Sequence, residues 1–354
     1  MNIALDNRKL VYSGRIDLTN PKRPEFIFPA SSLSFSFRGR KAVLTVENKG
    51  AYWDNYVGAI IDGIQRKWKL NQNGETKITL LEEMGEEVHE IMVFKRQDSC
   101  HEMAFVSLEL SDGSSLLEPK ARPARRMEVY GDSVSAGEVS EAVEYAGKED
   151  PWHNGEYSNS WYSYAWIAAR KLSAELHDIA QGGIGLLNGT GWVAPPVYPG
   201  MEFMWDRMHY HPQLGGDTPW DFSRYTPHLV IVAVGQNDSN PDNYMKDNLY
   251  GERASYWKYK YRRLVEDIRA KYPKALILLT TTILEHDENW DKAIDEVCQE
   301  LEDERVKHFM YSDNGKGTPG HIRVQEAEKM AEELVAYING LDIPIWESEY
   351  KEKL

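Results

Sequence analysis

The pattern of hydrophobic residues changes near residue 118, and this change constrains the fold most strongly. Before it, short stretches such as Ser32–Phe37 alternate polar and apolar side chains. After it, continuous apolar stretches such as His228–Val234 alternate with long amphipathic stretches such as Glu252–Lys271. The first pattern is typical of antiparallel strands with one buried face, and the second of parallel strands covered by helices. We therefore predict two domains of different fold class.

The first domain, residues 1–118, is predicted to be a β-sandwich of the jelly-roll type. Strand-like segments recur every ~10–15 residues with Gly, Asn or Asp between them, which is typical of sandwiches. They are Ser32–Phe37, Ala42–Val46, Tyr56–Asp62, Thr76–Leu81, His89–Lys95 and Met103–Leu110. Two roles stay open for this half: it binds carbohydrate as a separate module, or it forms one wall of a cleft in the second half.

The second domain, residues 119–354, is predicted to be α/β with a parallel sheet, because strand-like and helix-like segments alternate. The predicted strands are Glu128–Tyr130, Glu175–Ala180, His228–Val234, Ala275–Ile283 and Val306–Tyr311. The predicted helices are Trp161–Leu172, Glu252–Lys271, Trp290–Glu302 and Ile322–Ile338. A segment rich in proline and arginine, Pro119 to Arg126, joins the two domains.

The composition excludes several classes of partner. A net charge of −15 argues against nucleic acid and anionic membranes as ligands, and it fits a neutral substrate. The chain lacks an apolar stretch of the ~20 residues that a membrane span needs, and its first residues do not resemble a signal peptide. We therefore expect a cytoplasmic protein without a membrane partner; the sequence leaves open a homo-oligomer. Cys100 and Cys298 do not suggest a disulfide framework.

One turn in the second domain has the form that a nucleophilic serine requires. The apolar segment Met127–Tyr130 runs into Gly131-Asp132-Ser133. A rigid strand behind the serine, an open sheet edge in front of it and nearby backbone N–H groups are what acyl transfer needs. Small turn residues often follow strands, so this motif acquires meaning only from the residues downstream.

Three further groups suited to this chemistry follow other predicted strands of the same sheet. Gly183 follows the second strand, Asn237 the third, and His321 lies between the last strand and the last helix. Because the carboxyl ends of parallel strands meet at one edge, we expect these groups to lie close to Ser133. Ser133 would be the nucleophile and His321 its base, while the N–H groups of Ser133, Gly183 and Asn237 would form an oxyanion hole.

A metal site is a weaker alternative. It would draw on His209, His211, Asp206 and Asp217, but their spacing matches no strong zinc pattern. The sequence also lacks a Walker-type phosphate loop. We therefore expect neither a metal nor a cofactor.

The order of these motifs resembles that of the SGNH (GDSL-type) hydrolases and, more narrowly, of carbohydrate esterase family 2. The segments that carry the resemblance are Tyr12–Asp17, Gly131–Gly137, Trp220–Arg224 and Pro227–Asp238. The resemblance covers nearly the whole chain and implies a jelly roll before a flavodoxin-like α/β/α hydrolase domain. It also implies a serine esterase that removes O-acetyl groups from plant-derived oligosaccharides of the xylan or glucomannan/mannan type, through an acetyl-enzyme. The alternatives are a lipase or thioesterase on the same fold, and a noncatalytic carbohydrate-binding protein.

The chain departs from the SGNH pattern at one position. Many members carry an aspartate three residues before the histidine, whereas this chain has Thr318. Of the two arrangements left open, we favour a Ser–His dyad oriented by a backbone carbonyl over a carboxylate such as Asp313. Asp132, beside the nucleophile, is interpreted as a structural hydrogen-bonding residue.

The expected partner is an acetylated oligosaccharide, and aromatic residues would bind it. The chain has 11 Trp and 20 Tyr, and aromatic rings stack on the faces of sugars. Trp192 is the first candidate because it follows the predicted oxyanion glycine, and Trp220 and Trp152 are the next. The long polar segment Glu138–Asn159 is either a lid or rim of the site, or an insertion without a role in substrate binding.

Overall fold

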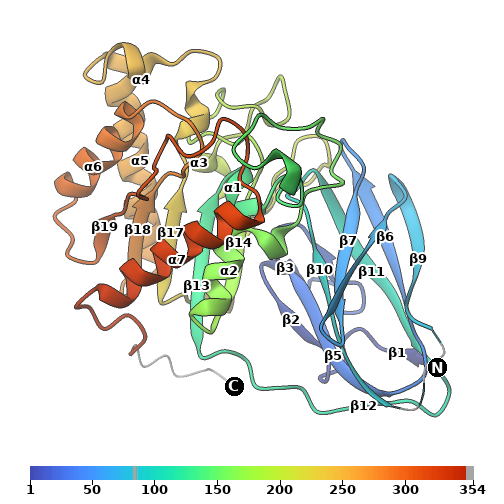
Figure 1. The fold of residues 1–354 in the computed structure, drawn as a ribbon. Helices are drawn as coiled ribbons and strands as arrows, with labels where there is room; N and C mark the ends of the chain where they lie inside the picture. Colours follow the sequence, from blue (N-terminus) through green and yellow to red (C-terminus); the bar gives the residue numbers. More distant parts are fainter. Residues whose placement is uncertain (83–84, 86, 348–354) are drawn as a thin grey trace.

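The computed structural model describes residues 1–82, 85 and 87–347. Figure 1 shows a β-sandwich, in blue and teal, beside an α/β unit coloured from green to red. Strand β12 (Ser115–Leu116) is the last of the sandwich, and β13 (Arg125–Gly131) is the first of the parallel sheet. An extended connection joins the two. The change of hydrophobic pattern thus coincides with a change from antiparallel to parallel strands.

The sandwich consists of two antiparallel sheets. One has the order β3-β4-β11-β6-β9 with β1 beside β11, and the other the order β12-β5-β10-β7-β8 with β2 beside β5. Their bounds are β1 Asn2–Ile3, β2 Val11–Ser13, β3 Ile16–Asp17, β4 Glu25–Phe26, β5 Ser32–Gly39, β6 Ala42–Gly50, β7 Tyr56–Ile61, β8 Ile64–Lys69, β9 Asn73–Leu81, β10 Glu87–Lys95 and β11 His101–Leu110. All six predicted strands are present. Strand β8 was missed because mostly exposed polar side chains hide its alternation.

The core of the sandwich explains its register. Leu33, Phe35 and Phe37 of β5 point between the sheets, where they pack with residues such as Phe26 and Phe105. The intervening serines of β5 face outward, as the two-residue period of a strand requires. The predicted sandwich is confirmed.

The second unit is built on one parallel sheet of five strands in the order β14-β13-β17-β18-β19. Their remaining bounds are β14 Ala174–Ala180, β17 Leu229–Ala233, β18 Leu276–Thr280 and β19 Val306–His308. Numbered by chain position this order is 2-1-3-4-5, the flavodoxin-like arrangement. A small antiparallel pair, β15 Arg207–His209 and β16 Thr218–Pro219, lies outside this sheet. The predicted α/β/α fold is confirmed.

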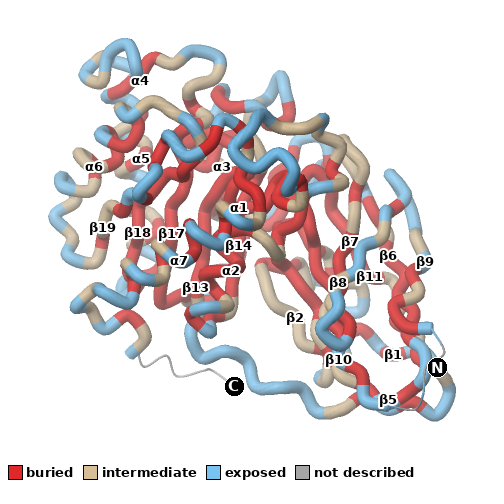
Figure 2. The backbone as a smooth tube through the Cα atoms, viewed as in Figure 1, coloured by how far each residue is buried: buried red, intermediate tan, exposed pale blue. Residues whose placement is uncertain are grey.

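Helices cover both faces of the parallel sheet. Buried side chains of α2 and α7 pack with Met127 and Val129 on one face, and those of α5 and α6 with Val230 and Val232 on the other. The strands between them are almost wholly buried (Figure 2). The helices are α1 Ser133–Ala136, α2 Tyr164–Lys171, α3 Met201–Met204, α4 Tyr244–Asp247, α5 Glu252–Lys271, α6 Asn289–Glu300 and α7 Val324–Gly340, with 3₁₀ turns at Val143–Tyr145, Ser160–Tyr162, Phe222–Arg224 and Gln236–Ser239.

The helix predicted over Trp161–Leu172 is divided into a 3₁₀ turn and α2. Two caps cause the division: the Asn159 side chain accepts a hydrogen bond from the backbone N–H of Trp161, and the Ser163 side chain accepts one from that of Trp166. Such short polar side chains end one helical segment and begin the next.

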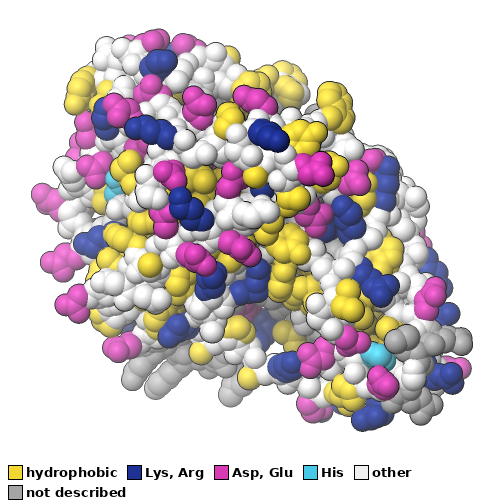
Figure 3. Space-filling model, in the orientation of Figure 1, with side chains coloured by type: hydrophobic (Ala, Val, Ile, Leu, Met, Phe, Trp, Pro, Cys, Tyr) yellow, Lys and Arg dark blue, Asp and Glu magenta, His cyan; other side chains and the backbone are white. Residues whose placement is uncertain are grey.

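Acidic and basic side chains are interspersed over the face in Figure 3. None of the helices in the described ranges combines the length and the hydrophobicity that a membrane span requires.

A charged clamp joins the two units. His209 of β15 lies 3.0 Å from Glu102 of β11 and 3.1 Å from Asp17 of β3. Burial alone would lower the pKa of His209, but the two carboxylates outweigh burial and raise this pKa to about 9. A histidine whose pKa rises on folding stabilises the protein fully below its ordinary pKa of about 6.5. This stabilisation is lost as the pH rises through 9.

We therefore expect His209→Gln to reduce the free energy of unfolding by about 2–3 kcal/mol near pH 6. The difference from the wild type should shrink towards pH 10, where the wild-type imidazole is neutral. Urea unfolding at both pH values measures this difference in the free energy of unfolding. His308→Gln is the control, because the ion pair of His308 with Asp295, at 3.2 Å, lies within the α/β unit. A loss at His209 that does not change with pH would refute the ionic clamp.

Candidate active site

Ser133 is the first residue of α1, directly after the central strand β13. Asp132 caps the helix: its side chain accepts a hydrogen bond from the N–H of Val134 at 3.0 Å. Because Ser133 occupies the first helical position, its own N–H has no acceptor within the helix. The sharp strand-to-helix turn therefore presents both the hydroxyl and the N–H of Ser133 at the carboxyl edge of the sheet. Asp132 also accepts hydrogen bonds from Gln236 and Asn237, which fits its predicted structural role.

His321 lies next to Ser133, although 188 residues separate them in the chain. Its Nε2 is 2.8 Å from Ser133 Oγ, and its Nδ1 is 2.5 Å from Asp150 Oδ2. Donation of the Nδ1 proton to Asp150 leaves the Nε2 lone pair free to accept the serine proton. The three side chains have the connectivity of a nucleophile, a base and an orienting carboxylate.

The predicted dyad is wrong, because Asp150 supplies the orienting carboxylate. Asp150 lies in the segment Glu138–Asn159. The Arg323 guanidinium also donates a hydrogen bond to Asp150 Oδ1 at 2.7 Å. Asp313, the alternative, instead pairs with Lys329 on the surface. Thr318 cannot replace the usual aspartate, and its backbone carbonyl binds Glu285 N at 2.9 Å. The bonds from His153, His321 and Arg323 outweigh burial and hold the pKa of Asp150 well below its ordinary range.

The predicted oxyanion donors line the same cleft as Ser133 and His321, which has a volume of about 630 Å³. Gly183 follows β14 in a left-handed turn with φ +72°. Asn237 lies in the 3₁₀ turn after β17, and its Nδ2 donates to Asp132 Oδ2 and to the carbonyl of Ile184, both at 3.1 Å. Donation to a substrate oxygen would therefore require Asn237 to share one of these bonds. The geometry is compatible with the predicted roles, which stay predictions.

The sandwich supports the turn that contains Gly183. Asp98, in the connection between β10 and β11, accepts a hydrogen bond from Gly182 N at 2.6 Å and one from Gln181 Nε2 at 2.7 Å. Burial and the nearby charge of Glu138 raise the pKa of Asp98. The backbone of this turn is thus held from both units.

Gly183 cannot be replaced without movement of its neighbours. A Cβ on Gly183 would lie 2.8 Å from Trp192 Cβ, and φ +72° disfavours any L side chain. For hydrolysis of an acetyl ester, we expect Gly183→Ala to lower kcat by about 100- to 1000-fold, which is the cost of a displaced oxyanion donor. Gly189→Ala is the matched control, since Gly189 has φ +86° in the same loop but open space around it. Equal losses of kcat in both variants would contradict the role of Gly183.

The aromatic candidates differ in position. Trp192 is 65% exposed and lines the cleft, and its role in substrate binding stays a prediction. Trp152 is 86% exposed and lines an adjoining depression with Trp53 and Asp150. Trp220 does not line the cleft, so its prediction as a substrate platform at this site is wrong. It is 5% exposed and packs against the guanidinium groups of Arg15 and Arg224.

Sequence reasoning missed other residues of the cleft. Tyr52 and Trp53, between β6 and β7, form a wall contributed by the sandwich. Glu138 and His153 lie beside the triad in the long polar segment. The sequence carries a signal for His153, because Asp150-Pro-Trp-His153 concentrates titratable and aromatic residues in one loop. Of the two roles left open for the sandwich, formation of a wall is the one seen here.

Two groups of described residues bring three potential metal-ligand atoms within 4.8 Å of one another: Asp150, His153 and His321, and Glu25, Glu102 and His209. In both groups the imidazole nitrogens already lie at hydrogen-bonding distance from carboxylate or hydroxyl oxygens. We interpret both groups as hydrogen-bonded networks. The set considered in the sequence is separated: Asp206 and Asp217 pair with Arg207, and His209 belongs to the clamp.

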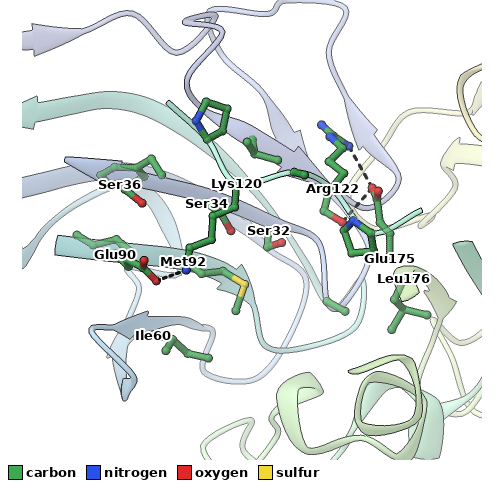
Figure 4. Close-up of a pocket in the computed structure, with 18 of the residues that line it drawn as sticks. Ser32, Ser34, Ser36, Ile60, Glu90, Met92, Lys120, Arg122, Glu175 and Leu176 are labelled. Atoms are coloured by element: carbon green, nitrogen blue, oxygen red, sulfur yellow. Dashed lines mark hydrogen bonds and ion pairs between the residues drawn. The ribbon is translucent and has the colours of Figure 1, made fainter. Parts of the chain in front are cut away.

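A separate cleft of about 450 Å³ lies under the connection between the two units (Figure 4). Its floor includes the outward serines of β5, Ser32, Ser34 and Ser36. Lys120 and Arg122 of the connection cross it and bind Glu90 at 2.8 Å and Glu175 at 3.1 Å. None of the predicted site residues is among those that line it.

Comparisons with known proteins agree with the fold and the motifs. Residues 12–119 match the family model "Carbohydrate esterase 2 N-terminal". The chain is 28% identical to an acetylxylan esterase / glucomannan deacetylase from Cellvibrio japonicus over 94% of this chain and 88% of that protein. It is 27% identical to a cellulase/esterase from Acetivibrio thermocellus over 94% of this chain, but it spans only 39% of that protein.

Solved structures extend the likeness to the whole chain. A family two carbohydrate esterase from Clostridium thermocellum, in complex with cellohexaose, superposes with a TM-score of 0.77 at 25% identity, over 93% of this chain and 98% of that one. The fold of a family two carbohydrate esterase from Cellvibrio japonicus agrees with a TM-score of 0.80 at 24% identity, over 96% and 97%. With the motif order and the two-part fold, these matches show that the chain is similar to family two carbohydrate esterases over nearly its whole length.

Proposed function

We propose that this protein is a serine esterase that removes O-acetyl groups from plant-derived oligosaccharides of the xylan or glucomannan/mannan type. The observation that carries the proposal is the chain of contacts from Ser133 Oγ to His321 Nε2, at 2.8 Å, and from His321 Nδ1 to Asp150 Oδ2, at 2.5 Å. Such a chain activates a hydroxyl for attack on an acyl carbon. The deacetylase activity of a relative supports the choice of acyl group.

The reaction would follow two matched steps. Ser133 Oγ attacks the acetyl carbonyl while its proton moves to His321 Nε2, and the carbonyl oxygen becomes an oxyanion beside the N–H groups of Ser133 and Gly183. His321 then protonates the departing sugar oxygen, which leaves an acetyl-enzyme. Water gives a proton to His321, attacks the same carbonyl and releases acetate as the proton returns to Ser133.

The lining of the cleft favours a neutral sugar. Aromatic faces of Tyr52, Trp53 and Trp192 are available to stack on sugar rings. The carboxylates of Glu138, Asp150 and Glu285 line it as well, whereas the described lining residues include neither lysine nor arginine. An anionic substituent would therefore be repelled, as the net charge of the chain already suggested.

The test is acetate release from acetylated xylan- and glucomannan-derived oligosaccharides, beside a long-chain ester, with Ser133→Ala as the blank. Acetate release by the wild type alone would support the proposal, and the faster oligosaccharide would identify the glycan. Cleavage of the long-chain ester without acetate release would favour a lipase or thioesterase. Sugar binding without turnover of either ester would favour a noncatalytic binding protein.

A further inference from the structure

Two carboxylates and two imidazoles form a closed ring beside Ser133. Asp150 Oδ2 is 2.5 Å from His321 Nδ1 and 3.1 Å from His153 Nε2. His153 Nδ1 is 2.8 Å from Glu138 Oε1, and Glu138 Oε2 returns to within 3.9 Å of His321 Nε2. The mechanism above uses only the side of the ring formed by Asp150 and His321. It leaves Glu138 and His153 without a role.

Glu138 is held rigidly against the nucleophile. Gly137 ends α1 in a left-handed conformation, and the N–H of Glu138 donates to the carbonyl of Ser133 at 2.9 Å. The residue is 8% exposed. A carboxylate so far removed from water requires a charged partner. His153 supplies one, and His321 is the other cation within reach whenever it holds a proton.

We propose that Glu138 and His153 are positioning residues of this esterase: Glu138 presents a second carboxylate to the Nε2 side of His321, and His153 both holds Glu138 there and weakens the hold of Asp150 on Nδ1. This inference rests on the proposed function. It assigns to each residue an opposite effect on the same imidazole. Neither residue exchanges a proton with the substrate.

The direction in which each residue shifts the pKa of His321 follows from the charges around the ring. Burial would lower the pKa of His321, but Glu138 and the bond to Asp150 outweigh burial and raise it. His153 acts in the opposite direction, because its bonds to Asp150 and Glu138 raise its own pKa to about 10 and keep it cationic. The other charged groups that face the ring are Arg323 on Asp150, Asp132 near His321, and Asp98 near Glu138.

The arrangement has a use in both steps of the reaction. His321 becomes an imidazolium each time it takes a proton, from Ser133 or from water. A carboxylate on each side of the ring stabilises that cation. A lone Glu138 would also oppose the negative charge that develops on the substrate oxygen, and the positive charge of His153 offsets this effect.

The experiment is the pH dependence of kcat/KM for hydrolysis of an acetyl ester that Ser133→Ala does not cleave. We expect Glu138→Gln to lower the pKa of the acid limb by about one pH unit and His153→Gln to raise it by about half a unit. The double variant should fall between them. Glu144→Gln is the matched control, since it removes an exposed carboxylate six residues from Glu138 and should leave the limb in place.

A second measurement separates this inference from the proposed function. NMR titration of ¹⁵N-labelled imidazoles follows His153 and His321 in the same variants without any substrate. His153 that titrates near its ordinary value in the wild type, or shifts of the His321 pKa in the same direction in both variants, would overturn the ring even in an active esterase. Opposite shifts in an enzyme without turnover would uphold the ring and refute the esterase. If Glu138→Gln does not fold, Glu138→Asp should give a smaller shift of the same sign.

Discussion

Replacement of Ser133 by alanine should lower kcat for acetyl ester hydrolysis by about a millionfold, to the level set by binding and the oxyanion donors alone. The reason is geometric. Ser133 Oγ is the atom 2.8 Å from His321 Nε2, at the first position of α1, so the next serine of that helix cannot replace it. Ser135 is buried and its hydroxyl lies 2.9 Å from the Tyr164 hydroxyl. The measurement is single-turnover hydrolysis with enzyme in excess.

The same experiment shows whether Ser133 and His321 act as one unit or contribute independently to kcat. If His321 acts only by taking the proton of Ser133, the kcat of the double variant Ser133→Ala/His321→Ala should be little lower than the kcat of either single variant. Ser135→Ala is the control within the helix and should keep most of the activity. Losses that multiply in the double variant would show that His321 acts on the substrate without Ser133.

Replacement of Asp150 by asparagine should lower kcat by about ten-thousandfold near neutral pH. An amide at this position can donate a hydrogen bond to Nδ1, and the imidazole would then carry its proton on Nε2, where the serine needs a lone pair. The loss should diminish at high pH, where hydroxide replaces the base. The measurement is kcat from pH 6 to 10 on the same acetyl ester.

Asp313→Asn is the natural comparison, because Asp313 is the carboxylate that lies nearer to His321 in the sequence. It pairs with Lys329 on the surface and should tolerate the change without loss of kcat. A large loss at Asp313 with a small one at Asp150 would reverse the assignment. Circular dichroism of both variants excludes misfolding as the cause, since Asp150 also binds Arg323.

The fold and the meeting of four residues could be predicted because both follow from periodic patterns. Alternating side chains predict the sandwich, and continuous apolar strands predict the parallel sheet. Once the strands are parallel, Ser133, Gly183 and Asn237 must lie near one edge, since each follows the end of a neighbouring strand. His321 joins them from the loop before α7.

The residues that escaped prediction depend on tertiary contacts without a periodic signal. Asp150 reaches His321 across 171 positions from a polar loop, so its spacing from the motifs carries no information. Trp220 lies in a motif-rich segment, but its exposure depends on Arg15, which approaches from the sandwich. Strand β8 lacks a buried face that alternation could reveal. For Asp150 and Trp220 the deciding partner is distant in the sequence, whereas β8 pairs with the adjacent strand β7.

The hydrogen bonds from Gly182 and Gln181 to Asp98 bear on how such proteins diversify. Here the accessory half supplies the acceptor that holds a catalytic turn, together with the wall formed by Tyr52 and Trp53. A recombination event that replaced the sandwich would therefore remove part of the reaction centre. A designer who joins this α/β unit to a new module must therefore rebuild the Asp98 contact.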